Sequence, residues 1–142
     1  ILAISVSMQG GNMQYDREGS IKRDRAAKLG PGKGALVSAF RPDGSLKPEW
    51  MDRLLMLQQA LDKRGMALNV MYIYAHQDEV FDSPKAIDAA VRNMTDWLID
   101  HQCRNVLIEI ANEYDIGGFD HNRYIFNQMG HLIELARERF KA

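Results

Sequence analysis

The stretch that decides the fold is residues 105–115, Asn-Val-Leu-Ile-Glu-Ile-Ala-Asn-Glu-Tyr-Asp. Its first part, Asn105–Ala111, is a nearly continuous apolar run, which predicts a strand buried on both faces, as in a parallel sheet. Side chains alternate along a strand, so Glu109 and Glu113 are expected on the same side. Polar Asn112 and Glu113 follow where the strand ends.

Two earlier apolar runs, Ile1–Met8 and Met66–Tyr74, predict two more strands of the same kind. The first run is followed by a long loop rich in glycine and charge, from Gly10 to about Lys47, whose middle, Arg17–Gly34, we expect to be mobile. An amphipathic helix is predicted after each run. Three strand–helix units in alternation indicate an α/β fold with parallel strands.

Helix boundaries are marked by proline, serine and glycine. Pro48 opens the first helix and Gly65 stops it, while Ser83 caps the second with Pro84 at its first position. The third helix is expected from about Asn122 to Phe140. The apolar stripe predicted for the first helix is Trp50, Leu54, Leu57 and Leu61.

Composition limits the possible functions. The chain has 142 residues, 46% of them hydrophobic and 26% charged, with a formal net charge of -1, as expected of one globular domain. We therefore expect no nucleic acid and no membrane as partner. Cys103 is the only cysteine, so an internal disulfide is excluded. The start of the chain lacks the features of a signal peptide, and the compartment stays open.

Polar side chains collect just after each predicted strand, where α/β sheets place their functional sites. The short helix-to-strand connections carry no such set. The residues predicted to bind substrate are Gln9, Asn12, Tyr74, His76, Gln77 and Asn112.

Glu113 is the predicted catalytic residue. A carboxyl group that is partly desolvated at a strand end can have its pKa raised toward neutrality, and can then give a proton to a leaving oxygen and take one from water. Asn112 can bond a sugar hydroxyl. Glu109 lies too deep to meet substrate, and we expect it to be a buried acid paired with an arginine or a tyrosine.

The stretch Asn105–Asp115 resembles the fourth strand of clan A glycoside hydrolases, notably the family 5 cellulase-like enzymes, which are (β/α)8 barrels. Their hallmark is an Asn-Glu pair at that strand end, often with another Glu four residues before the catalytic one, as in Asn112, Glu113 and Glu109. The resemblance implies that Glu113 is the acid/base of a retaining hydrolase that acts on poly- or oligosaccharides without a cofactor. Proteins of this family are often secreted or periplasmic.

The same resemblance implies that residues 1–142 form a partial barrel, from about the second strand to the fourth helix. The family's nucleophile is a glutamate on the seventh strand, and this chain has no match for it. We therefore expect the chain to be a fragment and to be inactive alone. His76 corresponds to the family's usual histidine after the third strand, although the residues around it depart from the common form.

Three alternatives stay open. A nucleotide or phosphate site at Gly30–Gly34 has little support, because the stretch neither follows a strand nor opens a helix. A non-catalytic carbohydrate-binding or assembly module would cover its open sheet edges by self-association. A metal-dependent α/β enzyme would draw its ligands from His76, Asp78, Glu79, Asp115, Asp120 and His121, which have no recognised ligand spacing.

Overall fold

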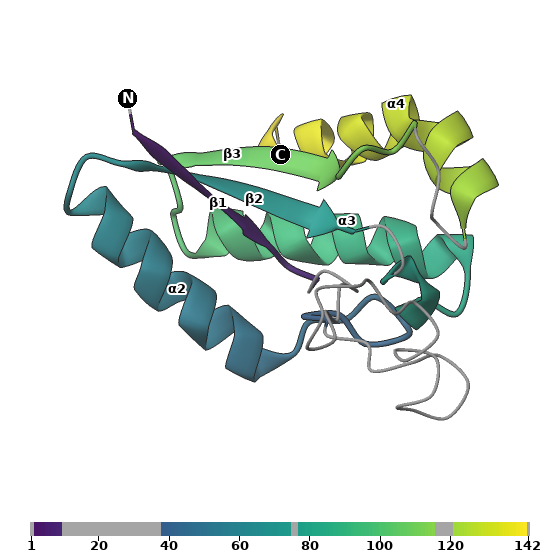
Figure 1. Cartoon of the computed structure of the whole chain (residues 1–142), viewed down its shortest axis with the longest axis horizontal. Helices are drawn as coiled ribbons and strands as arrows, with labels where there is room; N and C mark the ends of the chain where they lie inside the picture. The colour runs from purple at the N-terminus through teal and green to yellow at the C-terminus, as the bar shows by residue number, and fades with distance from the viewer. Residues whose placement is uncertain (1, 10–37, 75–76, 116–120, 142) are drawn as a thin grey trace, which may run out of the picture.

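The structure is a computed structural model that describes residues 2–9, 38–74, 77–115 and 121–141. Its strands form one parallel sheet in the order β1-β2-β3, and each is followed by a helix (Figure 1). The expected middle of the long loop lies outside the described residues. The elements are β1 (Ala3–Ser7), α2 (Pro48–Asp62), β2 (Ala67–Ile73), the 3-10 turn η1 (Asp78–Val80), α3 (Pro84–Asp100), β3 (Val106–Ala111) and α4 (Asn122–Lys141).

The predicted α/β class is therefore confirmed in its coarser form, as a three-stranded parallel sheet with three α-helices in the described part of the chain. The strands fall within the three apolar runs, and the helices begin at Pro48, Pro84 and Asn122 as expected. Ser83 caps α3, since its hydroxyl accepts the Ala86 N–H. A closed barrel is not shown.

One face of the sheet carries the core. Leu68, Val70 and Tyr72 of β2 are fully buried and point toward the helices, where the Tyr72 hydroxyl meets Thr95 of α3. Figure 1 shows α2 on the β1 side, α4 on the β3 side and α3 between them. The core thus forms between the sheet and a single layer of helices.

The opposite face of the sheet carries a polar row at its middle, while Ile73 and Ala111 at its carboxyl end are buried. The Asn69 amide nitrogen lies 3.3 Å from the Ser5 hydroxyl and 3.1 Å from a carboxylate oxygen of Glu109. The strand β1 differs from the expected buried strand, because residues 3–5 are exposed. Nothing in the described ranges pairs with its outer edge.

The stripe predicted for α2 is correct only in part. Leu54 and Leu61 are buried as expected, but the other buried positions are Met51 and Gln58. Gln58 reaches the amino end of β3, where its amide nitrogen lies 2.6 Å from the Asn105 side-chain oxygen. The remaining two members of the predicted stripe, Trp50 and Leu57, stay half-buried.

A short hairpin across residues 38–46 was not predicted. It pairs Phe40 with Leu46 in antiparallel fashion, and the Gly44 N–H closes its turn onto the Arg41 carbonyl at 2.9 Å. Gly44 has a φ of +84° and its carbonyl accepts the side-chain amide of Asn93 on α3. The hairpin is thereby held against the first half of α3.

The burial of the Tyr72 hydroxyl is expected to lower the stability of the fold at alkaline pH. Thr95 donates its hydroxyl to the Val91 carbonyl at 2.7 Å, so the Tyr72 hydroxyl must donate to Thr95, at 3.1 Å. Burial raises the pKa of Tyr72 above its ordinary value of 10.0. The stability that this group contributes is complete below about pH 10 and is lost as the pH rises further, by up to about 1.4 kcal/mol per pH unit for one proton.

Tyr72→Phe is therefore expected to flatten the decline in the free energy of unfolding above pH 10, and to cost about 1 kcal/mol at neutral pH through the lost hydrogen bond. Urea titrations of both proteins from pH 7 to the alkaline limit would measure both effects. An alkaline slope that is equal in the two proteins would show that another group sets the limit.

Candidate functional site

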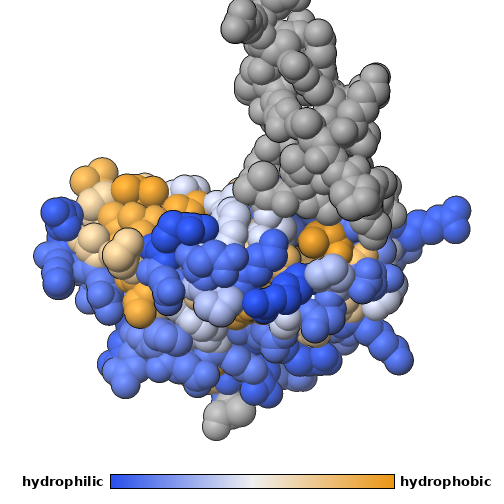
Figure 2. Space-filling model, turned by 90° about the horizontal axis from the view of Figure 1, so that it is seen from below, coloured by the Kyte–Doolittle hydropathy of each residue, from blue (hydrophilic) through white to orange (hydrophobic). Residues whose placement is uncertain are grey.

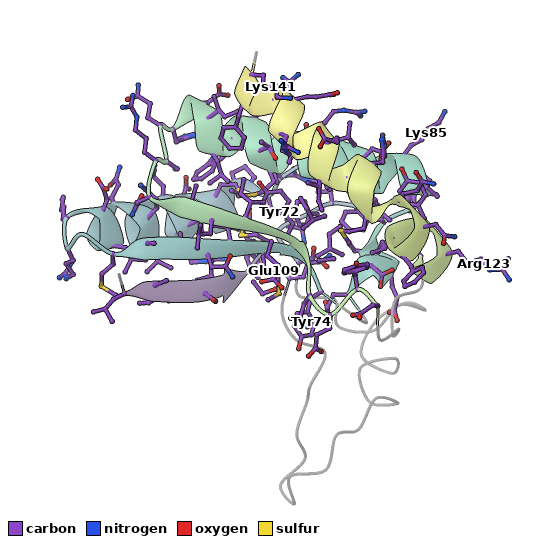
Figure 3. All side chains as sticks on the ribbon, turned by 90° about the horizontal axis from the view of Figure 1, so that it is seen from above. Tyr72, Tyr74, Lys85, Glu109, Arg123 and Lys141 are labelled. Carbon is purple, nitrogen blue, oxygen red and sulfur yellow. The ribbon has the colours of Figure 1, made fainter. Side chains whose placement is uncertain are left out.

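The carboxyl ends of the three strands lie along one edge of the sheet. In the parallel register Ser7 is paired with Met71, and Ile73 with Ala111, so the residues that follow each strand are neighbours. Figure 3 shows Tyr74 beyond the strand ends and Glu109 further back on the sheet. For the residues that the structure describes, this register confirms the sequence prediction that the polar residues after the three strands share one edge.

Asn112 and Glu113 form a turn directly after β3. The Asn112 N–H still bonds the Ile73 carbonyl of β2, at 3.0 Å, while its side-chain amide lies 3.4 Å from a carboxylate oxygen of Glu113. Glu113 itself has a φ of +46°. The strand alternation that was expected to place Glu113 on the side of Glu109 therefore ends before it.

The left-handed backbone of Glu113 is a local cost, because a side chain with a Cβ rarely adopts it. The other described non-glycine residue with positive φ is Gln102, and it has a structural reason. The N–H groups of Gln102 and Cys103 bond the Ile99 and Leu98 carbonyls, which is the Schellman ending of a helix. Glu113 follows a strand, so no helix ending explains its backbone, and strain of this kind clusters at functional sites.

The Glu113 side chain is exposed in the described structure, whereas the sequence analysis expected a partly desolvated carboxyl. Asn112 beside it is half-buried, and Tyr114 and Asp115 after it are exposed. The carboxyl group is thus accessible to a ligand, with an amide next to it. Glu109 is half-buried and its described partner is the amide of Asn69, not the arginine or tyrosine that was expected.

Gln9 is fully buried and binds within the protein. Its amide nitrogen donates to the Ser38 hydroxyl and to the Gln77 carbonyl, both at 3.1 Å, and its amide oxygen accepts the Tyr74 N–H at 2.8 Å. Both hydrogens of the amide are therefore used. Gln9 was expected to contact a sugar directly. In the structure its side chain instead holds the end of β2 against the end of β1.

Gln77 and Asp78 are also buried, and they connect loops rather than line a surface. An Asp78 carboxylate oxygen accepts the His121 N–H at 2.7 Å, and the His121 ring nitrogen lies 3.0 Å from the Phe81 carbonyl. His121 in turn offers its carbonyl to the first turn of α4. A carboxylate at a helix N-terminus is electrostatically favourable, so Asp78 anchors the start of α4.

The predicted catalytic residue Glu113 and the predicted substrate-binding residues Tyr74 and Asn112 therefore remain at an accessible strand edge. Tyr74 is half-buried, and its backbone is fixed by Gln9. Asn12 and His76 lie outside the described residues. Sequence reasoning missed Ser38, which completes the Gln9 network, and no sequence signal marked its long-range pairing.

No group of three histidine, cysteine, aspartate or glutamate side chains comes together to hold a metal ion within the described ranges. No described helix combines the length and the apolar character needed to cross a membrane. Comparison of the chain with models of known protein families, with curated proteins and with solved structures found no match. The resemblance to family 5 therefore stays a prediction that rests on the residues named above.

Proposed function

We propose that the protein is a retaining glycoside hydrolase whose general acid/base is Glu113 and whose sheet is part of a (β/α) barrel. The observation that carries the proposal is the Asn112–Glu113 pair, hydrogen-bonded and accessible, at the carboxyl end of a parallel strand. In barrels of this type catalytic side chains come from the ends of several strands. The strained backbone of Glu113 supports the same role.

The chemistry requires two carboxyl groups about 5 Å apart. Glu113 donates a proton to the glycosidic oxygen while a second carboxylate attacks the anomeric carbon, so that the bond to the leaving sugar breaks and a glycosyl–enzyme ester forms. Glu113 then removes a proton from water, which attacks the ester and releases the sugar. We propose that the second carboxylate comes from outside the described residues. No cofactor takes part in this scheme.

Substrate contacts in this proposal come from Asn112 and Tyr74. The Asn112 amide bonds a sugar hydroxyl next to the reacting carbon, where such a bond strengthens in the transition state. Tyr74 offers a half-buried ring at the neighbouring strand end, and an aromatic ring with a hydroxyl provides both an apolar face and a polar group. The substrate class is therefore an oligo- or polysaccharide.

The proposal is tested by expressing the reading frame that encodes this chain at its natural length and assaying it against a panel of oligosaccharides. Proton NMR of the first-formed product gives the anomeric configuration. Hydrolysis with retained configuration is expected. A product of inverted configuration would exclude the second carboxylate as nucleophile, and failure to hydrolyse any glycoside would overturn the proposal.

A further inference from the structure

One buried side chain holds the ends of the strands together. Gln9 lies just beyond β1 and is fully buried. Its amide oxygen accepts the Tyr74 N–H at 2.8 Å, and its amide nitrogen donates to the Gln77 carbonyl and to the Ser38 hydroxyl, both at 3.1 Å. The amide cannot be reversed, because the Tyr74 N–H requires an oxygen and the Gln77 carbonyl requires a hydrogen. These partners therefore fix the orientation of the Gln9 side chain.

The bond from Gln9 to Tyr74 leads on to β3 through a single peptide group. The N–H of Tyr74 and the carbonyl of Ile73 belong to the same peptide group, and that carbonyl accepts the Asn112 N–H at 3.0 Å. In a trans peptide the N–H and the C=O point in opposite directions. The group therefore binds Gln9 on one side and Asn112 on the other, and it joins the ends of all three strands.

This peptide group has the opposite orientation to the one that the regular strand predicts. Residues two apart in a strand direct their backbone groups to the same neighbouring strand. Met71 of β2 faces β1, since its carbonyl accepts the Met8 N–H at 2.8 Å. The Ile73 carbonyl should therefore also face β1, but it bonds Asn112 on the β3 side. The reversal turns the next N–H toward β1, where the Gln9 oxygen accepts it and stabilises the reversed group.

Glu113 follows directly on this support. The bond between Asn112 and Ile73 fixes the backbone immediately before Glu113, whose φ of +46° begins the turn. We propose that Gln9 is a positioning residue for the acid/base, because its amide sets the peptide group on which Asn112 and the turn at Glu113 rest. This role rests on the proposed function of Glu113. Gln9 itself is too deeply buried to touch a substrate.

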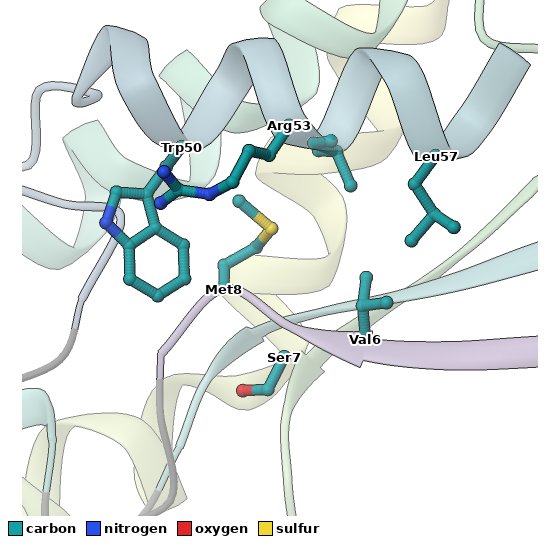
Figure 4. Close-up of a pocket in the computed structure, with 7 residues that line it drawn as sticks. Val6, Ser7, Met8, Trp50, Arg53 and Leu57 are labelled. Atoms are coloured by element: carbon teal, nitrogen blue, oxygen red, sulfur yellow. The ribbon is translucent and has the colours of Figure 1, made fainter.

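The backbone from which Gln9 acts is itself held in place. Figure 4 shows Met8 turned toward α2 and Ser7 turned away from it, and Met8 is buried there. Gln9 also forms an antiparallel bridge with Ser38. A supporting residue whose own position is locked by packing and hydrogen bonds can hold a catalytic group to the precision that catalysis needs.

The role of Gln9 does not depend on how the outer surfaces of the sheet and helices are covered. Figure 2 shows an apolar patch at the left of the molecule, the side on which Figure 1 places the N-terminus. In the proposed barrel a neighbouring strand–helix unit would cover that patch. The partners of Gln9 are Ser38, Tyr74 and Gln77, and all three lie within the described chain.

The test compares two substrates in the natural-length protein and in its Gln9→Met variant, because methionine has nearly the shape of glutamine but forms none of these hydrogen bonds. An unactivated oligosaccharide needs the proton of Glu113, whereas an aryl glycoside of an acidic phenol does not. At saturating substrate, hydrolysis of the oligosaccharide should fall by about 100-fold, as a small displacement of a catalytic group can cost. Formation of the glycosyl–enzyme ester from the aryl glycoside should change by less than about threefold. A loss of folded protein alone would lower both rates by the same factor.

Gln58→Met is the matched control. Gln58 is also a buried amide, but it lies at the amino end of β3, where its nitrogen is 2.6 Å from the Asn105 side-chain oxygen. The same substitution there should lower the Tm to a similar extent and leave the ratio of the two rates as in the parent.

Hydrogen exchange at the Asn112 N–H tests the same support without turnover. NMR of the natural-length protein labelled with 15N-asparagine follows this amide. It should exchange roughly tenfold faster in Gln9→Met than in the parent, because its acceptor is no longer held, and Gln58→Met should leave it near the parent's rate. Gln9→Asn, whose amide is one methylene short of the Tyr74 N–H, replaces Gln9→Met if the methionine variant does not fold.

The two measurements keep the role of Gln9 separate from the proposed function. If the parent hydrolyses no glycoside, the proposed function fails, and exchange at Asn112 still decides whether Gln9 supports the turn. The role of Gln9 would be overturned by an equal loss on both substrates, or by exchange at Asn112 that is the same in Gln9→Met as in the parent.

Discussion

Replacing Glu113 with glutamine is expected to lower kcat/KM for an unactivated oligosaccharide by about 100-fold to 10,000-fold in the natural-length protein. Glutamine keeps the shape of the side chain and can still accept the hydrogen bond from Asn112, but it cannot donate the proton that the leaving oxygen needs. The loss should fall on the step that breaks the glycosidic bond. Initial rates of oligosaccharide hydrolysis measure it.

The dependence on leaving group separates catalysis from positioning. When the substrate is an aryl glycoside of an acidic phenol, the phenolate leaves without being protonated. Glu113→Gln should therefore form the glycosyl–enzyme ester from such a substrate at a nearly normal rate. The ester should then accumulate, because no base activates the water that hydrolyses it. In Glu113→Ala, azide needs no base to attack the ester and should restore turnover with a glycosyl azide as product. The acid/base role would be contradicted if Glu113→Gln lost activity equally on the oligosaccharide and the aryl glycoside, and if azide did not restore the activity of Glu113→Ala.

Glu109→Gln is the matched control. Glu109 lies four residues earlier, and a glutamine there can still accept the hydrogen bond from Asn69. Activity within a factor of a few of the parent is expected, because Glu109 sits back on the sheet away from the strand ends. If Glu109→Gln lost activity as completely as Glu113→Gln, the reaction would require both carboxyl groups, and the assignment of the acid/base role to Glu113 alone would be wrong.

The second large effect is expected at Gly44. A Cβ built on it would lie 2.2 Å from the Ala86 carbonyl oxygen and 2.7 Å from the Ala90 nitrogen, both in the backbone of α3. The residue also has a φ of +84°, which costs a side chain about 1–2 kcal/mol. With the overpacking cost of about 1–3 kcal/mol added, Gly44→Ala should lower the free energy of unfolding by about 2–5 kcal/mol and the Tm by roughly 5–20 °C.

Two other glycines separate the causes of that loss. Gly65 has a φ of +65° but nothing within 4 Å of a built Cβ, so Gly65→Ala should cost only the backbone part, about 1 kcal/mol. Gly130 lies inside α4 with open space around it, and Gly130→Ala should stabilise the chain by about 0.5–1 kcal/mol. Thermal melts of the three variants in one buffer compare them. Equal losses at Gly44 and Gly65 would show that the close approach to α3 carries no cost.

Local signals allowed much of the fold to be predicted from the sequence. The apolar runs marked the strands, and the helix starts at Pro48 and Pro84 were marked by proline. The prediction that the polar residues after the strands share one edge of the sheet followed from the parallel topology alone. These features depend on neighbours in sequence or on a general rule of sheets, so a single chain reveals them.

Long-range contacts could not be predicted in the same way. Gln9 was expected to face a ligand, but its amide meets partners 29, 65 and 68 residues away in sequence. Strand alternation was expected to place Glu113 on the same side as Glu109, but the strand ends before Glu113 and the chain turns there. No residue in the local sequence marks that turn. The hairpin at residues 38–46 was missed because the expected loop was treated as one unit.

The antiparallel bridge between Gln9 and Ser38 has a practical consequence for protein engineering. It joins the two residues that border the segment 10–37, and the Ala39 N–H bonds the Met8 carbonyl at 2.8 Å beside it. With its base pinned in this way, the intervening stretch is a natural graft position, because the entropy of closing a longer insert grows only slowly with length. Foreign peptides or a whole small domain could be exchanged there while the sheet keeps its registration.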